Sequence, residues 1–492
     1  MLPKKGRINL LQWLRNFIII ISGYEIMTEH LLIDSFYAQK QKTLRFEADV
    51  YDCEVIGTVP KELNGALFRV GPDRAYPTLE GDVIINGDGI VSAFYFEDGN
   101  VDFRCRYVQT ERYLTEKRAR KRLYGAYRNP YTDDPSVANT NRDNTANTYG
   151  FYHHGKLFAL REDSHPTEID PATLTTIGEY DFDGKLKGLA MTAHPKIDPV
   201  TGEWWGFGLF SHKLFEGEMA LYVVSRDGEL IRDEEFKAPF PGICHDFAVT
   251  RDHVIFPVMP LVVDIDGARA GGDFYAYDPN QNPVYGIMPR TGTVADMRWF
   301  EVPHAFMGHV MNAWSEGDIV HFDAAISPGN PFTFFKDKSG NVTEPVMGLA
   351  TMTRLSFDLS NHNAPVAVQP FPNAVGEMPR LDERFQMSRY RYGYGKSRNG
   401  IIRLDWETLS LDEHLTPGAR TQEPIFVPRM TDAPEGDGWL LCVVNRPEEN
   451  RADLLIVDAM HIDRPPVATI RLPFDLPMAF HGMFQPGIIS NR

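Results

Sequence analysis

The sequence predicts a single all-β domain over residues 45–492. Short runs of alternating apolar and polar residues recur from about residue 45 onward, and long amphipathic helical stretches are scarce. Turn residues separate these runs, and no long Pro/Ser-rich tract divides the chain. Many short antiparallel strands without a linker fit a propeller, a sandwich pair or a large barrel, and no WD-like or kelch-like repeat selects among them.

The turn residues support this prediction locally. Residues 91–96 and 101–108 flank the Asp-Gly pair at 98–99, which suits the positive φ angles of a tight hairpin turn. Two stretches depart from the strand pattern: the Arg/Lys-rich residues 110–128 are expected to contain a helix, and the Asn/Asp-rich residues 129–147 a loop. Similar turn residues lie beside β-branched or aromatic runs at 198–202, 227–228, 317–318, 338–340 and 435–438.

Composition narrows the class of partner. The 492 residues are 43% hydrophobic and 24% charged, as in an ordinary globular protein, and the net charge is −17. That charge disfavours nucleic acid and anionic lipid, so a neutral or apolar small molecule is the expected partner. The scattered cysteines favour neither a thiolate zinc site nor a disulfide framework, which predicts a reducing cytoplasm; they are Cys53, Cys105, Cys244 and Cys442.

Residues 1–44 are predicted to form an N-terminal extension. Their apolar segment, residues 8–24, follows basic residues and loosely resembles a signal peptide or an interfacial helix. Arg15 and Asn16 interrupt it, and the uninterrupted run is too short to span a bilayer. Met27 offers an alternative start, so we expect the extension to be dispensable, with a membrane or export role as the open alternative.

Four of the fifteen histidines stand among apolar or small residues, where a buried imidazole needs partners. They are separated by 51, 64 and 172 residues. If one propeller blade takes roughly 50 to 70 residues, they recur at equivalent places, with two blades skipped before the last, and converge on the axis. The spacing alone is weak support for that arrangement. The four residues are His194, His245, His309 and His481.

The four histidine segments, together with residues 65–73, 86–90 and 160–163, closely resemble the carotenoid cleavage oxygenase family, over essentially residues 45–492. The resemblance implies a seven-bladed β-propeller capped by helices and loops, with iron(II) on the axis held by the four histidines. His304 is the rival for the third ligand. His309 is preferred because the Asn-Ala-Trp-x-Glu-Gly sequence that follows it is the family's own.

The resemblance also implies three glutamates that accept hydrogen bonds from the outer nitrogens of three ligand histidines. The matching positions are Glu162, Glu377 and Glu435. Such carboxylates fix the imidazole tautomer and raise its basicity. Without the resemblance, each would be taken for a solvated surface glutamate.

Four neutral imidazoles would leave iron(II) its full charge and, in an octahedral frame, up to two open positions for O2. We therefore expect O2 as cosubstrate and no organic cofactor. In the family, the organic substrate lies beside the iron without binding it. Thr148 matches a threonine of bacterial members whose side chain restricts access to one open position.

Residues 127–136 and 144–148 most resemble the lignostilbene and phenylpropanoid-alkene branch, whose members split a stilbene or 4-hydroxystyrene into aldehydes. In that branch a tyrosine and a lysine hold the 4-hydroxyl group. Tyr127 matches the tyrosine, and Arg161 stands in place of the lysine. An arginine can pair with a phenolate but stays protonated and cannot act as the base, so the enzyme either binds an already polarised phenolate or takes another alkene.

Two other functions remain open. Within the family, the alternative is cleavage of apocarotenoids or carotenoids, which the apolar N-terminal segment would suit. In a different class, the alternative is a catalytically silent propeller that serves as a binding platform. Four buried imidazoles without a metal would be costly, which disfavours the silent platform. The sequence does not indicate the oligomeric state.

Overall fold

The computed structural model describes residues 43–77, 82–138, 140–141, 143–209, 217–342, 350–361 and 363–491. The chain forms two compact units, Met1–Lys40 and Gln41–Arg492, and every described residue belongs to the second. The predicted extension therefore lies almost wholly outside the described residues, and the boundary at residue 45 stays a prediction. Among the described residues, no helix is long and apolar enough to cross a membrane.

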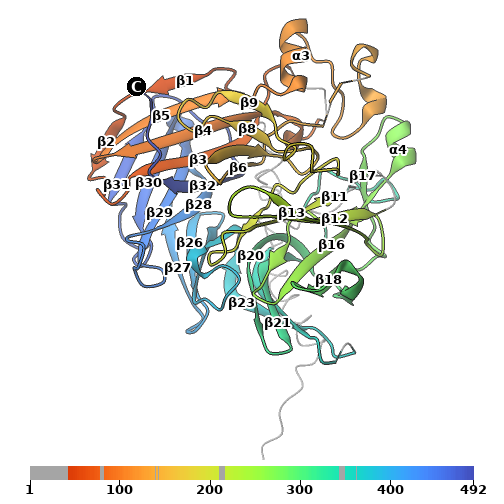
Figure 1. Ribbon diagram of the computed structural model, residues 1–492. Coiled ribbons are helices and arrows are strands. Elements are labelled where there is room, and N and C mark those ends of the chain that lie inside the picture. The colour runs from red at the N-terminus through yellow and green to blue at the C-terminus, as the bar shows by residue number, and fades with distance from the viewer. Residues whose placement is uncertain are drawn as a thin grey trace, which may run out of the picture. The chain divides into compact units, whose positions relative to one another are not determined.

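Strands dominate the described part of the chain and form six hydrogen-bonded sheets. The largest sheet has nine strands, in two antiparallel halves that meet through one parallel pair, His481 with Tyr149. Dividing the sheet at that pair gives seven blades in the described residues, which surround a common axis (Figure 1). The predicted all-β, seven-bladed propeller is confirmed.

The blades follow one another along the chain. The first contains β1 (Ala48–Val50), β5 (Asn100–Tyr107), β4 (Asp88–Glu97), β3 (Gly65–Asp73) and β32 (His481–Pro486). The second contains β6 (Tyr149–His153), β7 (Lys156–Leu160), β8 (Thr167–Ile169) and β9 (Thr176–Glu179), and the third β10 (Lys196–Ile197), β11 (Trp204–Leu209), β12 (Glu218–Val224) and β13 (Leu230–Lys237). The fourth contains β14 (Gly242–Ile243), β15 (Ala248–Val249), β16 (His253–Val263), β17 (Tyr275–Tyr277), β18 (Val284–Pro289) and β19 (Arg298–Glu301).

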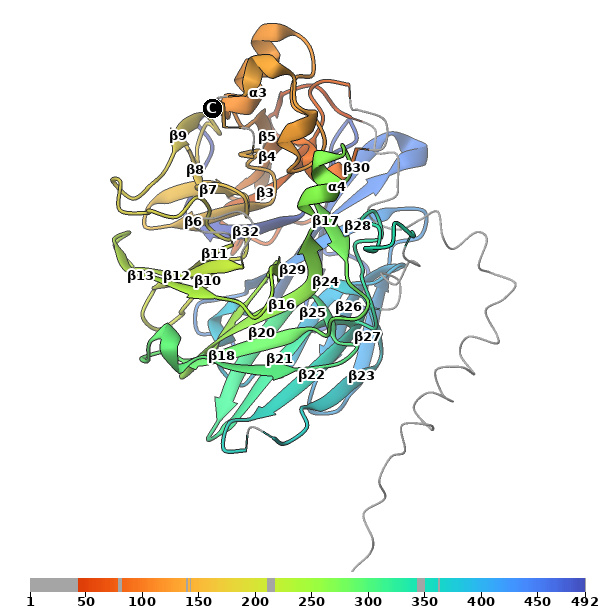
Figure 2. The ribbon, with the colours of Figure 1, turned by 90° about the vertical axis from the view of Figure 1, so that its right-hand side faces the viewer.

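The remaining three blades complete the ring. The fifth contains β20 (Phe306–Glu316), β21 (Ile319–Ser327), β22 (Thr351–Asp358) and β23 (Ala367–Val375), and the sixth β24 (Glu377–Leu381), β25 (Tyr392–Lys396), β26 (Gly400–Asp405) and β27 (Ser410–Leu415). The seventh contains β28 (Arg420–Pro428), β29 (Gly438–Arg446), β30 (Arg451–Asp458), β31 (Ala468–Arg471) and β2 (Glu54–Gly57). Both ends of the domain close the ring, because β32 pairs with β3 (Figure 2) and β2 pairs with β31 (Figure 1).

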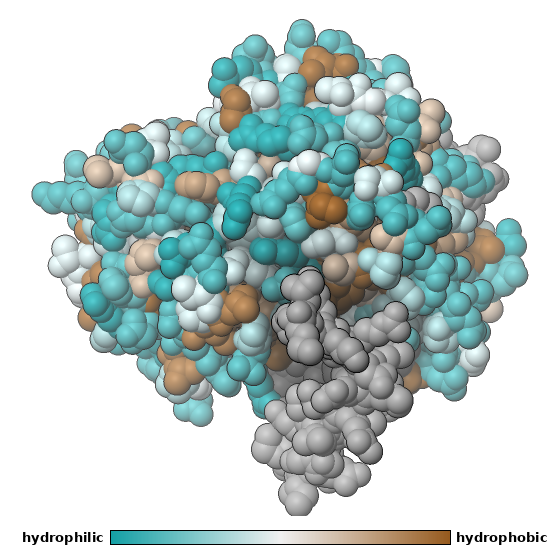
Figure 3. Space-filling view, turned by 90° about the horizontal axis from the view of Figure 1, so that it is seen from below, coloured by the Kyte–Doolittle hydropathy of each residue, from teal (hydrophilic) through white to brown (hydrophobic). Residues whose placement is uncertain are grey.

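The burial of each strand accounts for its pattern of apolar and polar residues. β3, near the axis, is buried at every position because it is enclosed on both faces. The outer strand β13 alternates half-buried and exposed residues, the period-two pattern of a strand with one face in water. The predicted hairpin between β4 and β5 is also present, with positive φ at both Asp98 and Gly99. One face of the molecule is largely hydrophilic, with scattered apolar patches (Figure 3).

Helices and loops form a cap beside the blades (Figure 1). The helix expected within residues 110–128 is α3 (Glu111–Ala119), which begins where the Thr110 side chain accepts a hydrogen bond from the Tyr113 amide. It ends at Arg120, whose φ of 55° is left-handed. A second short helix, α4 (Ile265–Arg269), lies in the fourth blade's connection. The cap carries the chain from α3 toward Tyr127 and Thr148, two of the predicted site residues.

Candidate metal centre

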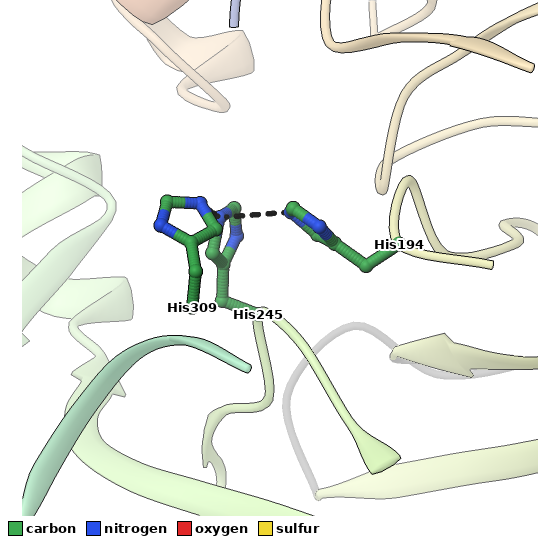
Figure 4. Close-up of side chains that lie close together, drawn as sticks. All are labelled: His194, His245 and His309. Atoms are coloured by element: carbon green, nitrogen blue, oxygen red, sulfur yellow. Dashed lines mark hydrogen bonds between the residues drawn. The ribbon is translucent and has the colours of Figure 1, made fainter. Parts of the chain in front are cut away.

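The four predicted histidines converge from four blades. His194 precedes β10, His245 lies between β14 and β15, His309 is in β20 and His481 opens β32. Ring centroids are 4.6 Å apart for His194 and His245, and 4.8 Å apart for His309 and His481. His194 lies 4.6 Å from His481 by the same measure. The three histidines that Figure 4 draws point their rings toward one another. Between His309 and His481 the chain passes through the sixth and seventh blades, which matches the long gap in the sequence.

Glutamates orient three of these rings. The Nδ1 atom of His245 lies 2.7 Å from Glu162 Oε2, and that of His309 lies 2.8 Å from Glu377 Oε2. The Nδ1 atom of His481 lies 2.9 Å from Glu423 Oε1. Because a carboxylate accepts, each Nδ1 donates, and in the neutral ring the lone pair is then on Nε2.

The inner nitrogens are spaced for one metal ion. Nε2 of His245 lies 3.2 Å from Nε2 of His194 and 3.3 Å from Nε2 of His309. Adjacent corners of an octahedron with metal–nitrogen bonds near 2.1 Å are about 3.0 Å apart, which is close to this spacing. The lone pairs of His245 and His309 face each other at that distance, which is unfavourable unless a cation lies between them. The residues present therefore fit a bound metal ion.

The prediction for Glu435 is wrong. Glu435 lies in the turn between β28 and β29, where its Oε1 accepts hydrogen bonds from the backbone amides of Arg391 and Tyr392 at 2.7 and 2.9 Å. Glu423, in the buried strand β28, occupies the expected position instead. The available signal was a lone glutamate directly before the apolar run at residues 424–427, since an ionised group in such a strand requires a partner.

His304 and His309 differ clearly in the structure. His304 is exposed in the turn before β20, with a φ of 59°, whereas His309 is buried among the other histidines. Of the four clustered histidines, His194 has no recorded glutamate partner among the described residues, and the Oδ2 atom of Asp246 lies 3.8 Å from its Nδ1 atom. That distance is longer than a hydrogen bond.

The electrostatics favour a neutral His194 and ionised glutamates. Burial, followed by the neighbouring imidazoles and Lys196, holds the pKa of His194 well below its usual range. Burial raises the pKa of Glu162, but His245, Arg161 and Arg128 together outweigh burial and bring that pKa to about 2. Burial also raises the pKa of Glu423, and Arg380 and His481 lower it further than burial raises it. His194 is therefore neutral at pH 7, and both carboxyl groups are ionised.

The predicted substrate-side residues form one network beside His245. The Tyr127 hydroxyl lies 3.5 Å from Glu162 Oε1, and the Arg161 guanidinium lies 5.0 Å from the centre of the Tyr127 ring. Arg161 donates to Asn147 Oδ1 at 2.9 Å, and the Thr148 hydroxyl donates to the same atom at 3.1 Å. Asn147, which joins them, was not predicted as a site residue, because its bond to Arg161 runs from the residue before Thr148 to the residue after β7.

Arg161 is fixed by a second partner. Its Nε and Nη2 atoms donate to Asp163 Oδ2 at 3.2 and 3.0 Å, and Asp163 also pairs with Arg128. The guanidinium is buried and held in one orientation by these bonds. Aromatic rings continue this side of the site: Phe332 lies 5.9 Å from His245, and Phe335 lies 6.1 Å from Tyr127, between ring centres.

A small charged chamber lies on the other side of the cluster. This cavity, about 60 Å³ in volume, is lined by His194, His309 and His481. A water molecule needs on the order of 10–15 Å³ of such space, so the chamber can hold a few waters. Aromatic and apolar side chains line part of it, among them Tyr149, Phe151 and Met311. Charged side chains also line it; they are Lys196, Asp246, Arg380, Glu383 and Glu423.

The chain matches a known protein family over most of its length. The model of the family described as retinal pigment epithelial membrane protein matches residues 41–486. The chain belongs to this family. Members of the family include the carotenoid cleavage oxygenases, so the resemblance on which the fold and the histidines were predicted is confirmed.

Similar proteins are oxygenases. The isoeugenol monooxygenase of Pseudomonas putida is 40% identical over 460 residues, which cover 90% of this chain and 96% of that protein. The crystal structure of Pseudomonas brassicacearum lignostilbene dioxygenase superposes with a TM-score of 0.87 at 36% identity and covers 91% of this chain and 97% of that one. Cobalt-substituted Synechocystis apocarotenoid oxygenase superposes with a TM-score of 0.78 at 27% identity, over 90% of this chain and 97% of that one. This chain is an oxygenase that cleaves carbon–carbon double bonds.

Proposed function

We propose that the four histidines hold one iron(II) ion, with which the enzyme uses O2 to split the side-chain double bond of a 4-hydroxystyrene or a stilbene into aldehydes. The observation that carries this proposal is the convergence of four imidazoles, three of them fixed through Nδ1 by glutamates. When bound, iron(II) supplies the electrons and the open positions that O2 requires. The chain's own residues orient the ligands and the alkene.

The three glutamates complement the charge of the metal. Glu162, Glu377 and Glu423 are carboxylates bonded to ligand histidines, so they place negative charge around a divalent ion while keeping the imidazoles basic. No carboxylate needs to bind the metal directly. This arrangement favours a reaction that requires O2 and the alkene but no organic cosubstrate.

On the aromatic side, Tyr127 and Arg161 hold the oxygen substituent of the substrate ring. Arg161 is fixed by Asp163 and Asn147, so it presents N–H groups in a set direction, and it stays protonated. Tyr127 orients the same substituent through its hydroxyl. The relatives named for isoeugenol and lignostilbene act on alkenes of this kind, which supports a phenylpropanoid substrate.

We assign Thr148 a restricting role at the metal. Its carbonyl accepts a hydrogen bond from the His481 amide at 3.0 Å, so the residue is held beside that ligand. Its hydroxyl is engaged by Asn147, which fixes the rotamer of the side chain. Thr148 would thereby limit access to one open position on iron.

A substrate panel tests the proposal. Iron-loaded protein is incubated with 4-hydroxystyrenes, 4-hydroxystilbenes, their 4-methoxy analogues and apocarotenoids, and aldehyde products are identified by mass. We expect cleavage of the 4-hydroxy compounds and poor cleavage of the methoxy analogues. Cleavage restricted to apocarotenoids would select the alternative that the similarity to the Synechocystis enzyme supports. Iron-loaded protein that consumes no O2 with any alkene in the panel would overturn the proposal.

A further inference from the structure

Asp246 lies in the segment that carries His245 and contacts the segments that carry His194 and His309. It follows His245 directly in the chain. Its Oδ2 atom accepts a hydrogen bond at 2.8 Å from the amide of Val310, the residue after His309. Its Oδ1 atom accepts one at 2.7 Å from the Nζ atom of Lys196, which lies two residues after His194. One buried carboxylate thus joins segments from the third, fourth and fifth blades.

Asp246 also faces the histidine that has no glutamate partner among the described residues. Its Oδ2 atom lies 3.8 Å from Nδ1 of His194, and both side chains are at most 5% exposed. A hydrogen bond of ordinary length would require the two atoms to approach by about 0.9 Å. The chamber beside both residues has room for water, so a bridging water is the other way to join them.

Lys196 fixes the carboxylate in this place. Its side chain is 12% exposed, and its Nζ atom lies over the Phe247 ring, 5.9 Å from the ring centre. The Phe247 amide donates a further hydrogen bond to Asp246 Oδ1 at 2.7 Å. With these donors and the Val310 amide, the orientation of the carboxylate is set independently of His194. A preset acceptor is what a ligand imidazole needs to keep one tautomer.

We propose that Asp246, anchored by Lys196, is the positioning residue for His194 and accepts a hydrogen bond from its Nδ1–H group, directly or through water, when the metal is bound. The proposal rests on the metal centre proposed above. It gives His194 the same kind of support that the glutamates give the other three rings. Through the Val310 amide, the same carboxylate ties the position of His194 to that of His309.

Metal release is the first test. Protein loaded with cobalt(II), wild type or variant, is mixed with excess chelator, and loss of the cobalt absorption is followed at a temperature where all variants are folded. Asp246→Asn should release the metal about 10-fold to 100-fold faster, the range typical of lost support for a ligand. Folded Asp246→Asn protein that releases metal at the wild-type rate would overturn the proposal.

A matched variant separates positioning from folding. Asp323 is another fully buried aspartate, in β21, where Arg354 donates to it twice at 2.8 Å and Tyr390 once at 2.8 Å. Asp323→Asn should lower the melting temperature but leave the rate of metal release unchanged. If Asp246→Asn does not fold, Lys196→Met decides: release at least threefold faster than wild type supports the proposal, and the wild-type rate contradicts it.

A spectroscopic readout identifies the ring. In cobalt(II) protein, imidazole N–H protons near the metal give strongly shifted proton resonances that disappear in D2O as they exchange. We expect four in the wild type and a selective shift or loss of one in Asp246→Asn. Three unchanged resonances with the fourth altered support the proposal, and four unchanged ones contradict it. Wild-type protein that binds no metal would instead refute the metal centre itself.

Discussion

Two groups of residues that border the histidine cluster differ in chemistry. On one side, aromatic rings and the Tyr127–Arg161 network approach Glu162 and His245. On the other side, a charged chamber of about 60 Å³ reaches His194, His309 and His481. A volume of that size holds a few water molecules. We therefore expect the alkene to approach from the aromatic side, with the residues of the chamber supporting the ligands.

The largest effect concerns the cluster that both sides share. His309→Ala should abolish metal binding, because it removes a ligand that Glu377 holds in place. His304→Ala should keep the metal, because His304 is exposed outside the cluster. Metal content by elemental analysis checks both variants. Metal retained in His309→Ala and lost in His304→Ala would show that the wrong neighbour has been placed in the site.

A smaller effect is expected for the glutamates. Glu423→Gln should weaken metal binding about 10-fold to 100-fold, because its carboxylate fixes the His481 ring. Glu435→Gln should leave metal affinity near the wild-type value, because Glu435 bonds only to backbone amides among its recorded partners. Competition with a chelator measures both affinities. Equal losses in the two variants would contradict the structural assignment of Glu423.

Substitutions on the aromatic side should change the preference between substrates, and substitutions at the chamber should not. Arg161→Lys should change the ratio of kcat/KM between a 4-hydroxystilbene and a 4-hydroxystyrene by about tenfold, a change typical of an altered pocket contact. Glu383→Gln, at the chamber, should leave that ratio unchanged. Steady-state kinetics with both substrates provide the comparison. A ratio that moves in Glu383→Gln but stays constant in Arg161→Lys would place the alkene on the charged side.

The smallest effect concerns Tyr127. Burial raises the pKa of its phenol, and the nearby Arg161 and Arg128 lower that pKa by less. Tyr127 therefore stays protonated at pH values where an exposed tyrosine would ionise. Tyr127→Phe should reduce kcat/KM for a phenolic substrate about fivefold, the loss of one hydrogen bond. The alkaline limb of the pH profile should not move, because Tyr127 does not titrate there. An alkaline limb that shifts in Tyr127→Phe would assign that titration to Tyr127.

Much of this arrangement could be predicted from the sequence. The Asp-Gly turn at residues 98–99 and the alternating strands gave the all-β class, and the spacing of the histidines matches the blades because each blade places an inner strand at the axis. The number of blades could be predicted only from the family resemblance, because the strand pattern alone also fitted a sandwich pair or a barrel. Partners such as Asp246 and Asn147 could not be predicted, since their hydrogen bonds join segments far apart in sequence. Glu423 was not predicted because the family resemblance was matched instead to Glu435, which lies in a turn.

The iron content of wild-type protein purified without oxygen tests the central claim most directly. The four histidines and their three glutamates predict one iron(II) ion per chain, retained through gel filtration. Protein that folds normally yet holds no iron after incubation with excess iron(II) would contradict the claim.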